Sequence, residues 1–185
     1  MVKFKFAETK IKDLYIIEPT VFHDDRGYFM ESYNKNEFIK ANLNINLDFV
    51  QDNESMSKKG VLRGLHFQEK YSQDKLVRVV KGKIFDVAVD LRKDSPTYLK
   101  WEGVILSDEN KKQFYIPKGF AHGYLVLSDY AIFSYKCTDY YHPEYENGII
   151  YNDSKIGVNW PLDDVSEIIL SEKDKNWKSV SQLNL

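Results

Sequence analysis

His66 and His122 are the residues of this chain best suited to proton chemistry. His66 lies within Arg63-Gly64-Leu65-His66-Phe67-Gln68, where an arginine accompanies the imidazole. An imidazole titrates near neutral pH and can accept a proton from carbon or oxygen, and a guanidinium binds oxyanions bidentately. The hexapeptide therefore combines a potential base with a potential anion-binding group, although by itself His66 fits a structural histidine on a strand better than a base.

Three further side chains could take part in such chemistry, and each also has an ordinary structural explanation. Tyr135 is one of 13 tyrosines and by default belongs to a sheet face. Asp174 lies three residues after Ser171, a spacing typical of a capping box at a helix start. Lys75 fits a solvated turn. Cys137 lies on the same strand face as Tyr135, and we expect it to be a packed thiol.

The composition predicts a single domain over residues 1–185. Hydrophobic residues make up 43% of the 185 positions and aromatic residues 15%, which supports a sizeable core and excludes a disordered chain. The net charge is −2, so no basic surplus indicates nucleic acid or an anionic membrane. A single cysteine fits a reducing cytoplasm. We find no signal-peptide core and no apolar run near the roughly 20 residues that span a bilayer.

The dominant hydrophobic period is two, which predicts strands. Ile84–Leu91 alternates a face of Phe, Val and Leu with a face of Asp and Ala. Lys81–Lys83 reads as a tight turn between this strand and the one before it. Helical signals are confined to Lys35–Asn42 and the region after Pro161. The other predicted strands are Leu76–Val80, Tyr98–Leu106, Gln113–Ile116, Gly123–Leu127 and Tyr130–Thr138. This spacing indicates an antiparallel sandwich or barrel, whose interior can hold one small ligand.

A series of motifs occurs in one order along roughly residues 5–177. They are Asp25-Arg26-Gly27-Tyr28-Phe29, Gln51-Asp52-Asn53, the Arg63–Gln68 hexapeptide, Lys75-Leu76-Val77-Arg78, Phe85-Asp86-Val87-Ala88-Val89-Asp90, Ile116-Pro117-Lys118-Gly119-Phe120-Ala121-His122-Gly123, Tyr135-Lys136-Cys137-Thr138, Asn152-Asp153, Ile156-Gly157-Val158-Asn159-Trp160-Pro161 and Ser171-Glu172-Lys173-Asp174. With this set the chain resembles the dTDP-4-dehydrorhamnose 3,5-epimerase family. Any one motif is weak, but the ordered set is specific.

The resemblance implies a mainly β fold: a cupin-type antiparallel jelly-roll β-barrel with a few short peripheral helices. It also implies a cytoplasmic homodimer with N-terminal strands exchanged or shared, and a reaction without metal, nicotinamide or other cofactor. The substrate would be dTDP-4-dehydro-6-deoxy-D-glucose, a dTDP-linked 4-keto-6-deoxy sugar. Inversion at C3 and C5 would give dTDP-4-dehydro-L-rhamnose, on the route to dTDP-L-rhamnose for cell-surface polysaccharide.

The resemblance also implies roles for individual residues. The catalytic base falls on His66, its orienting carboxylate on Asp174, the enolate-stabilising lysine on Lys75 and the acid on Tyr135. Lys75 is placed by the Leu76-Val77-Arg78 that follows it, because the segment before it does not align by motif. The implied ligand contacts are Arg26, Glu31, Gln51, Asn53, Arg63, Lys75, His122, Glu146 and Lys173. Tyr124 stands where phenylalanine is expected after the histidine-glycine pair.

These residue types suit the implied reaction. C3 and C5 both flank the C4 ketone, so loss of either proton gives an enolate. The step needs a base, a charge beside the oxyanion and an acid on the opposite face of the ring. A carboxylate on the second nitrogen of His66 would fix its tautomer and stabilise the imidazolium. Tyrosine stays protonated near neutral pH because its ordinary pKa is about 10.

A metal site is the main alternative for His122. Its proline-x-glycine-x-x-histidine setting resembles the second metal motif of metallo-cupins. A transition metal needs three or four converging ligands, yet the histidine-x-histidine pair of the first motif is here His66-Phe67-Gln68. We therefore expect no metal, and strand parity offers Asp86 as a partner for His122.

Other functions remain open at this stage. One is a single-centre epimerase, acting at C3 or C5 of a related nucleotide-linked 4-keto sugar. Others are a non-catalytic sugar-nucleotide-binding cupin and a metal-dependent cupin oxygenase. Keto-isomerases of related fold fit less well, because they use paired histidines and lack the tyrosine acid.

Overall fold

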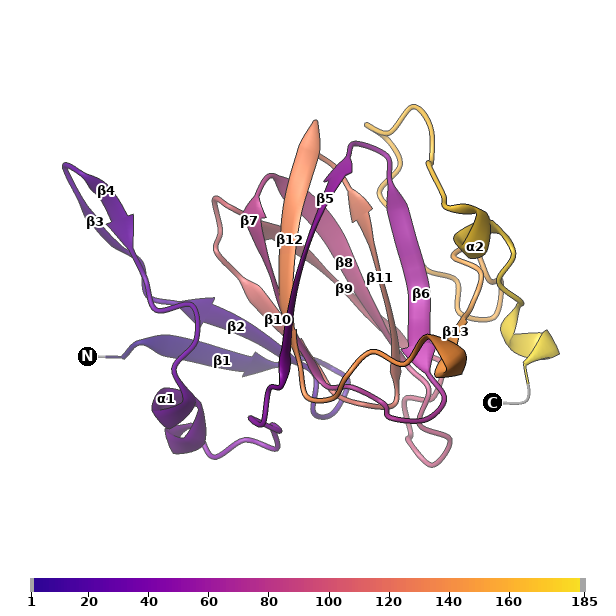
Figure 1. Cartoon of the computed structure of the whole chain (residues 1–185), viewed down its shortest axis with the longest axis horizontal. Helices are drawn as coiled ribbons and strands as arrows, with labels where there is room; N and C mark the ends of the chain where they lie inside the picture. Colours follow the sequence, from indigo (N-terminus) through magenta and orange to yellow (C-terminus); the bar gives the residue numbers. More distant parts are fainter. Residues whose placement is uncertain (1, 184–185) are drawn as a thin grey trace.

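Two antiparallel sheets face each other in the computed structural model, which describes residues 2–183 (Figure 1). The six-stranded sheet has the order β1 (Phe4–Glu8), β2 (Tyr15–Pro19), β10 (Gln113–Ile116), β7 (Lys75–Lys81), β12 (Tyr130–Cys137), β5 (Gln51–Lys58). The five-stranded sheet has the order β13 (Glu146–Gly148), β6 (Leu62–Gln68), β11 (Phe120–Val126), β8 (Lys83–Asp90), β9 (Trp101–Ser107). The predicted mainly β, jelly-roll architecture is confirmed.

The remaining elements are short and peripheral. The hairpin of β3 (Phe22–Asp24) and β4 (Gly27–Phe29) projects away from both sheets (Figure 1). The helices are α1 (Lys35–Lys40), α2 (Glu172–Lys175) and the 3₁₀ turns η1 (Pro143–Tyr145) and η2 (Val180–Gln182). No helix formed by residues 2–183 combines the length and apolar character that a membrane span requires.

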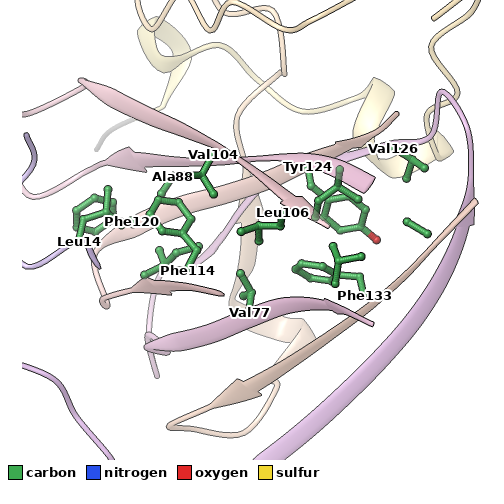
Figure 2. Packing of buried hydrophobic residues seen from close by; sticks show 14 of the residues in the cluster. Leu14, Val77, Ala88, Val104, Leu106, Phe114, Phe120, Tyr124, Val126 and Phe133 are labelled. Carbon is green, nitrogen blue, oxygen red and sulfur yellow. The ribbon is translucent and has the colours of Figure 1, made fainter. Parts of the chain in front are cut away.

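The main core lies between the two sheets, where apolar side chains from both fill the interior (Figure 2). Val77 and Phe114 come from the six-stranded sheet and Leu106 from the five-stranded one, and none of the three exposes any surface. Tyr124 and Phe133 pack with ring centroids 4.6 Å apart. Burial of such side chains contributes about 1.5–3 kcal/mol each, so this interior holds the sheets face to face.

The outer face of the five-stranded sheet is also covered. Val87 and Val89 on β8 pack in a second apolar cluster with Trp160 and Val180 from the C-terminal part of the chain. In Figure 1 this part, coloured orange to yellow, runs alongside β6. The opposite face of β8 points between the sheets. The alternation predicted for Ile84–Leu91 is therefore confirmed, and Asp86 on its second face is fully buried.

Most predicted boundaries fall within a few residues of the observed ones, and β9 and β11 differ most. β11 begins at Phe120, three residues before the predicted Gly123. The prediction began β9 at Tyr98, but it begins at Trp101. Tyr98 N–H donates to the Ser95 carbonyl at 3.1 Å, and Leu99 has a φ of 62°. The local hydrogen bond to Ser95 and the left-handed backbone of Leu99 thus hold these residues in a turn despite their strand-forming side chains. The strands β1 to β4, β5 and β13 were not predicted.

The predicted helical regions are shorter than expected. α1 occupies Lys35–Lys40 rather than Lys35–Asn42, and the Asn34 side chain caps it by accepting from the backbone N–H groups of Asn36 and Glu37. After Pro161 the structure contains only α2 and η2. Most of that region is irregular chain held by the second apolar cluster.

Adjacent residues on β9 provide a test of the core. Leu106→Ala should lower the free energy of unfolding by about 2–5 kcal/mol, because it leaves a cavity at a fully buried site. Ile105→Ala, at a neighbouring side chain that is 39% exposed, should cost less than about 1 kcal/mol. Urea denaturation of both variants gives the two values. Equal losses would contradict the proposed placement of the core.

Candidate active site

A cavity of about 670 Å³ opens between the two sheets at the end of the core that Tyr135 and Phe133 border. It collects side chains from strands that are far apart in the sequence. The residues expected at the site that line it are Gln51, Asn53, Arg63, His66, Lys75, His122, Tyr135, Glu146, Lys173 and Asp174. A cleft of this size suits a small-molecule ligand.

Strand register brings these side chains to one place. On the five-stranded sheet, His66 of β6 lies opposite His122 of β11 and opposite Gly148 of β13. On the six-stranded sheet, Tyr135 of β12 lies opposite Asn53 of β5. The two sheets therefore contribute different groups, and they do so from opposite walls of the cavity.

Two glycines allow β6 and β11 to approach closely beside His66. A Cβ atom on Gly64 would lie 2.5 Å from the Cα of Gly123, and one on Gly123 would lie 2.7 Å from the Arg63 carbonyl oxygen. Both distances are shorter than any Cβ contact tolerates. The glycine in the hexapeptide thus allows the backbone of β6 to lie close to that of β11 beside His66.

His66 is paired with Asp174. Its Nε2 lies 2.5 Å from Asp174 Oδ1, although 108 positions separate the two residues in the chain. Asp174 is 4% exposed. Burial by itself would raise the pKa of Asp174, but hydrogen bonds from His66 and Ser171 lower it to about 2. The expected carboxylate partner of His66 is thus confirmed as a contact, and it is ionised at neutral pH.

Tyr135 and Lys75 are perturbed mainly by burial. Burial and the neighbouring Cys137 and Tyr124 raise the pKa of Tyr135 to about 12, while Arg63 opposes the change. Burial lowers the pKa of Lys75, and the carboxylates of Glu146 and Asp86 oppose that change. Perturbed groups that converge on one cleft are typical of active sites.

His122 is paired with Asp86, as strand parity predicted. Its Nε2 lies 3.0 and 3.1 Å from the two carboxylate oxygens, and the imidazole stacks near the Phe133 ring with centroids 6.0 Å apart. Within residues 2–183, no three His, Cys, Asp or Glu side chains are grouped so that they could hold a metal ion.

Cys137 is a buried free thiol, as expected. It lies opposite Lys75 across the β7–β12 ladder and accepts a long hydrogen bond from the Asn53 amide. Burial raises the pKa of its thiol, although Lys75 opposes the change. The thiol is therefore a packed neighbour of Lys75 on the adjacent strand.

Arg26 and Glu31 are the two expected ligand contacts that the structure does not bring to this cavity. The Arg26 side chain is 89% exposed on the projecting hairpin and pairs with Asp24. Glu31 pairs with Lys3 and accepts from the Asn34 amide at 2.5 Å. Neither contacts the other candidate residues of the same chain.

Several cavity residues were not identified from the sequence. Tyr141 donates to Glu146 Oε2 at 2.5 Å, and Lys173 pairs with the same oxygen. Burial would raise the pKa of Glu146, but these two partners lower it. The hydroxyls of Tyr124 and Ser55 lie 3.2 Å apart at the cavity wall. The only available signal for Tyr141 was its place directly after a strand, in an aromatic pair that a surface loop explains equally well.

Known proteins resemble the chain over almost its entire length. The family model described as dTDP-4-dehydrorhamnose 3,5-epimerase matches residues 8–182. A protein of that description from Methanothermobacter thermautotrophicus is 57% identical over 182 residues, covering 98% of this chain and 97% of the relative. The structure of the 3,5-epimerase from Legionella pneumophila, in complex with dTDP-4-keto-L-rhamnose, has a TM-score of 0.93 at 51% identity and covers 98% of this chain and 95% of that chain.

A structure from a single-centre enzyme is also similar. ChmJ, a 3′-monoepimerase from Streptomyces bikiniensis solved with dTDP-quinovose, has a TM-score of 0.86 at 32% identity and covers 94% of this chain and 86% of that chain. This identity is lower than those to the two 3,5-epimerases. The resemblance drawn from the ordered motifs is confirmed.

The Asp174 carboxylate should make stability depend on acid pH. Its pKa of about 2 lies below the ordinary value of 3.8, so the stabilisation is complete above about pH 4 and is lost as the pH falls toward 2. This single group should contribute about 2 kcal/mol across that window. Asp174→Asn should therefore unfold with a flatter pH dependence below pH 4, measured by urea denaturation. Asp163→Asn, at an exposed position, should keep the wild-type slope; if the two variants behave alike, the assignment is wrong.

Proposed function

Because this chain belongs to the dTDP-4-dehydrorhamnose 3,5-epimerase family, we propose that its cavity binds dTDP-4-dehydro-6-deoxy-D-glucose. The enzyme is an isomerase. It inverts C3 and C5 of the 4-keto sugar to give dTDP-4-dehydro-L-rhamnose, an intermediate of dTDP-L-rhamnose biosynthesis. The observation that carries the residue roles is the His66–Asp174 pair, which lines the same cavity as Lys75 and Tyr135.

His66 is the base, and Nδ1 is its reacting nitrogen. Asp174 is ionised, so it accepts a hydrogen bond from the Nε2–H group, and the lone pair of the imidazole is left on Nδ1. Abstraction of the proton from C3 or C5 then forms an imidazolium, which the adjacent carboxylate stabilises. Each carbon flanks the C4 ketone, so the same base serves both.

Lys75 stabilises the enolate oxygen. It is half-buried on β7 at the wall of the cavity, where surroundings of low dielectric constant strengthen the attraction between its charge and an oxyanion. Loss of one such donor typically costs about 2.7–4 kcal/mol in barrier. The neighbouring carboxylates of Glu146 and Asp86 favour the charged ammonium, which is the form this role needs.

Tyr135 is the acid on the other face of the sugar ring. A pKa raised to about 12 keeps its hydroxyl protonated at neutral pH. Its strand belongs to the six-stranded sheet, whereas the strand of His66 belongs to the five-stranded sheet. A sugar held between the sheets would thus meet the base on one side and the acid on the other. Arg63 favours the tyrosinate that remains after proton transfer.

The other cavity residues bind the substrate. We assign the diphosphate to Arg63, whose guanidinium suits paired oxyanions. His122, oriented by Asp86, contacts a phosphate or hydroxyl oxygen. The remaining expected ligand contacts of the cavity are Gln51, Asn53, Glu146 and Lys173.

Arg26 and Glu31 complete the site from a second subunit. Neither residue lines the cavity of its own chain. The hairpin that carries Arg26 also exposes two aromatic side chains, Phe29 at 66% and Tyr28 at 53%. Exposed aromatic residues on a projecting hairpin are typical of an interface. The enzyme is then a homodimer that shares its N-terminal strands. Its setting is the cytoplasm, and residues 1–185 act as one domain.

Solvent exchange tests the reaction and the two proton-transfer roles. In deuterated water the product should carry deuterium at both C3 and C5, observed by NMR. His66→Asn should abolish exchange at both carbons. Tyr135→Phe should still exchange but invert little, because abstraction needs only the base.

The same experiment separates the alternatives. Exchange at only one carbon identifies a single-centre epimerase, and binding of the nucleotide sugar without any exchange identifies a non-catalytic binding protein. Full turnover in Tyr135→Phe would refute its role as the acid.

Mixed dimers test the donation of Arg26 across the interface. Arg26→Ala and His66→Asn should each be nearly inactive alone. Random mixing by unfolding and refolding should restore about one quarter of wild-type turnover, because half of the dimers then contain one intact site. If Arg26 acts within its own subunit, every mixed site carries a defect and turnover should not recover.

A further inference from the structure

Trp177 contacts the carboxylate that orients the base, yet it does not line the cavity. Its indole N–H donates to Asp174 Oδ1 at 3.2 Å, the same oxygen that accepts from His66 at 2.5 Å. The indole also meets the imidazole edge to face, with ring centroids 5.9 Å apart. Two N–H donors therefore share one carboxylate oxygen, and only one of them is the base.

Ser171 holds the second oxygen of the same carboxylate. Its hydroxyl donates to Asp174 Oδ2 at 2.7 Å and accepts from the Asp174 backbone N–H at 3.1 Å as the cap of α2. With His66, Ser171 and Trp177 as donors, both oxygens of Asp174 are occupied. The carboxylate has little freedom to rotate, and its negative charge is spread over three hydrogen bonds.

The position of Trp177 is set by a glycine next to the base. Gly148 lies directly opposite His66 on β13. A Cβ atom on Gly148 would lie 2.5 Å from the Cε2 atom of Trp177, so the indole rests on bare backbone. The bridge between Ile149 and Lys178 fixes the adjoining chain. The indole is thereby built into the sheet that carries the base.

We propose that Trp177 and Ser171 are positioning residues that determine how much of the Asp174 charge acts on His66. This inference rests on the proposed role of His66 as the base. Each hydrogen bond that Asp174 accepts from another donor weakens the one it accepts from the imidazole. The two residues thus limit how strongly Asp174 stabilises the imidazolium of His66.

The other charged and titratable groups around His66 come from several elements and stay in place when Trp177 or Ser171 is changed. One of them is Glu146, whose charge interacts with that of His66. The others that line the cavity are Arg63, Lys75, His122, Tyr135, Tyr141 and Lys173. A change in titration on removing the indole N–H therefore reports the shared oxygen rather than these groups.

The test replaces the donor and keeps an aromatic ring. In Trp177→Phe, Asp174 Oδ1 is left to His66 alone, so the imidazolium is favoured to higher pH. The acidic limb of the pH profile of kcat/KM should move upward by about 0.5–1 pH unit, with turnover near wild type on the plateau. Ser171→Ala should move the limb in the same direction.

Two matched controls separate this effect from general destabilisation. Trp160 donates its indole N–H to the Tyr151 carbonyl at 2.9 Å, outside the cavity, so Trp160→Phe loses an equivalent bond. Ser179 is the N-cap residue of η2, and its hydroxyl donates to the Gln182 side chain at 3.1 Å, so Ser179→Ala loses a comparable side-chain hydrogen bond. Both should keep the wild-type limb. Gly148→Ala, which displaces the indole without removing its N–H, should shift the limb as Trp177→Phe does.

A measurement without substrate keeps the inference independent of the proposed reaction. The chain has only four histidines, so ¹⁵N-labelled imidazole spectra of the ligand-free enzyme resolve the protonation midpoint of His66 directly. A midpoint that is higher in Trp177→Phe than in wild type supports the inference even if no epimerisation is found. An unchanged midpoint, or a loss of activity that is uniform across pH, would overturn it while leaving the epimerase function intact.

Discussion

The five-stranded sheet is apolar on both faces, and the need to cover both determines the rest of the molecule. The inner face packs on the six-stranded sheet, and the outer face packs under the C-terminal part of the chain. That second layer is mostly irregular chain, so side-chain burial rather than backbone pairing holds it in place. Because α2 is carried there, Asp174 reaches His66 from the far end of the sequence. The covering of the outer face of the sheet thus brings Asp174 into contact with His66.

The interior between the sheets combines two environments. Toward one end it is filled by side chains such as Phe114 and Leu106, and toward the other it opens into the cavity. Asp86 lies buried between the packed end and the cavity, where His122 hydrogen-bonds to its carboxylate. Burial of a charge without such a partner would cost several kcal/mol. The same low-dielectric surroundings lower the pKa of Lys75 and raise that of Tyr135. The packing that stabilises the barrel therefore also changes the proton affinity of groups that line the cavity.

Much of the fold could be predicted from local pattern. The alternation of Ile84–Leu91, the turn at Lys81–Lys83 and the strand Gln113–Ile116 follow from side-chain period and glycine placement, and the structure contains all three. Local pattern failed at Tyr98, whose backbone is held in a turn by a hydrogen bond to Ser95 and by the left-handed conformation of Leu99. Period two also distinguishes the two faces of β8 without showing that a second sheet covers the Asp-bearing one, so the complete burial of Asp86 is known only from the structure.

The sequence by itself determined the types of group available and, through the order of its motifs, the family and its reaction. It could nominate His66, Lys75, Tyr135 and Asp174 because these residues stand in recognisable motifs. Only the tertiary structure decided that Asp174 pairs with His66, that Trp177 shares its oxygen, and that Arg26 lies outside the cavity of its own chain. The physical reason is that each of these facts concerns a distance between segments far apart in the chain. Such distances are set by how the sheets and the C-terminal layer pack, and no local pattern records them.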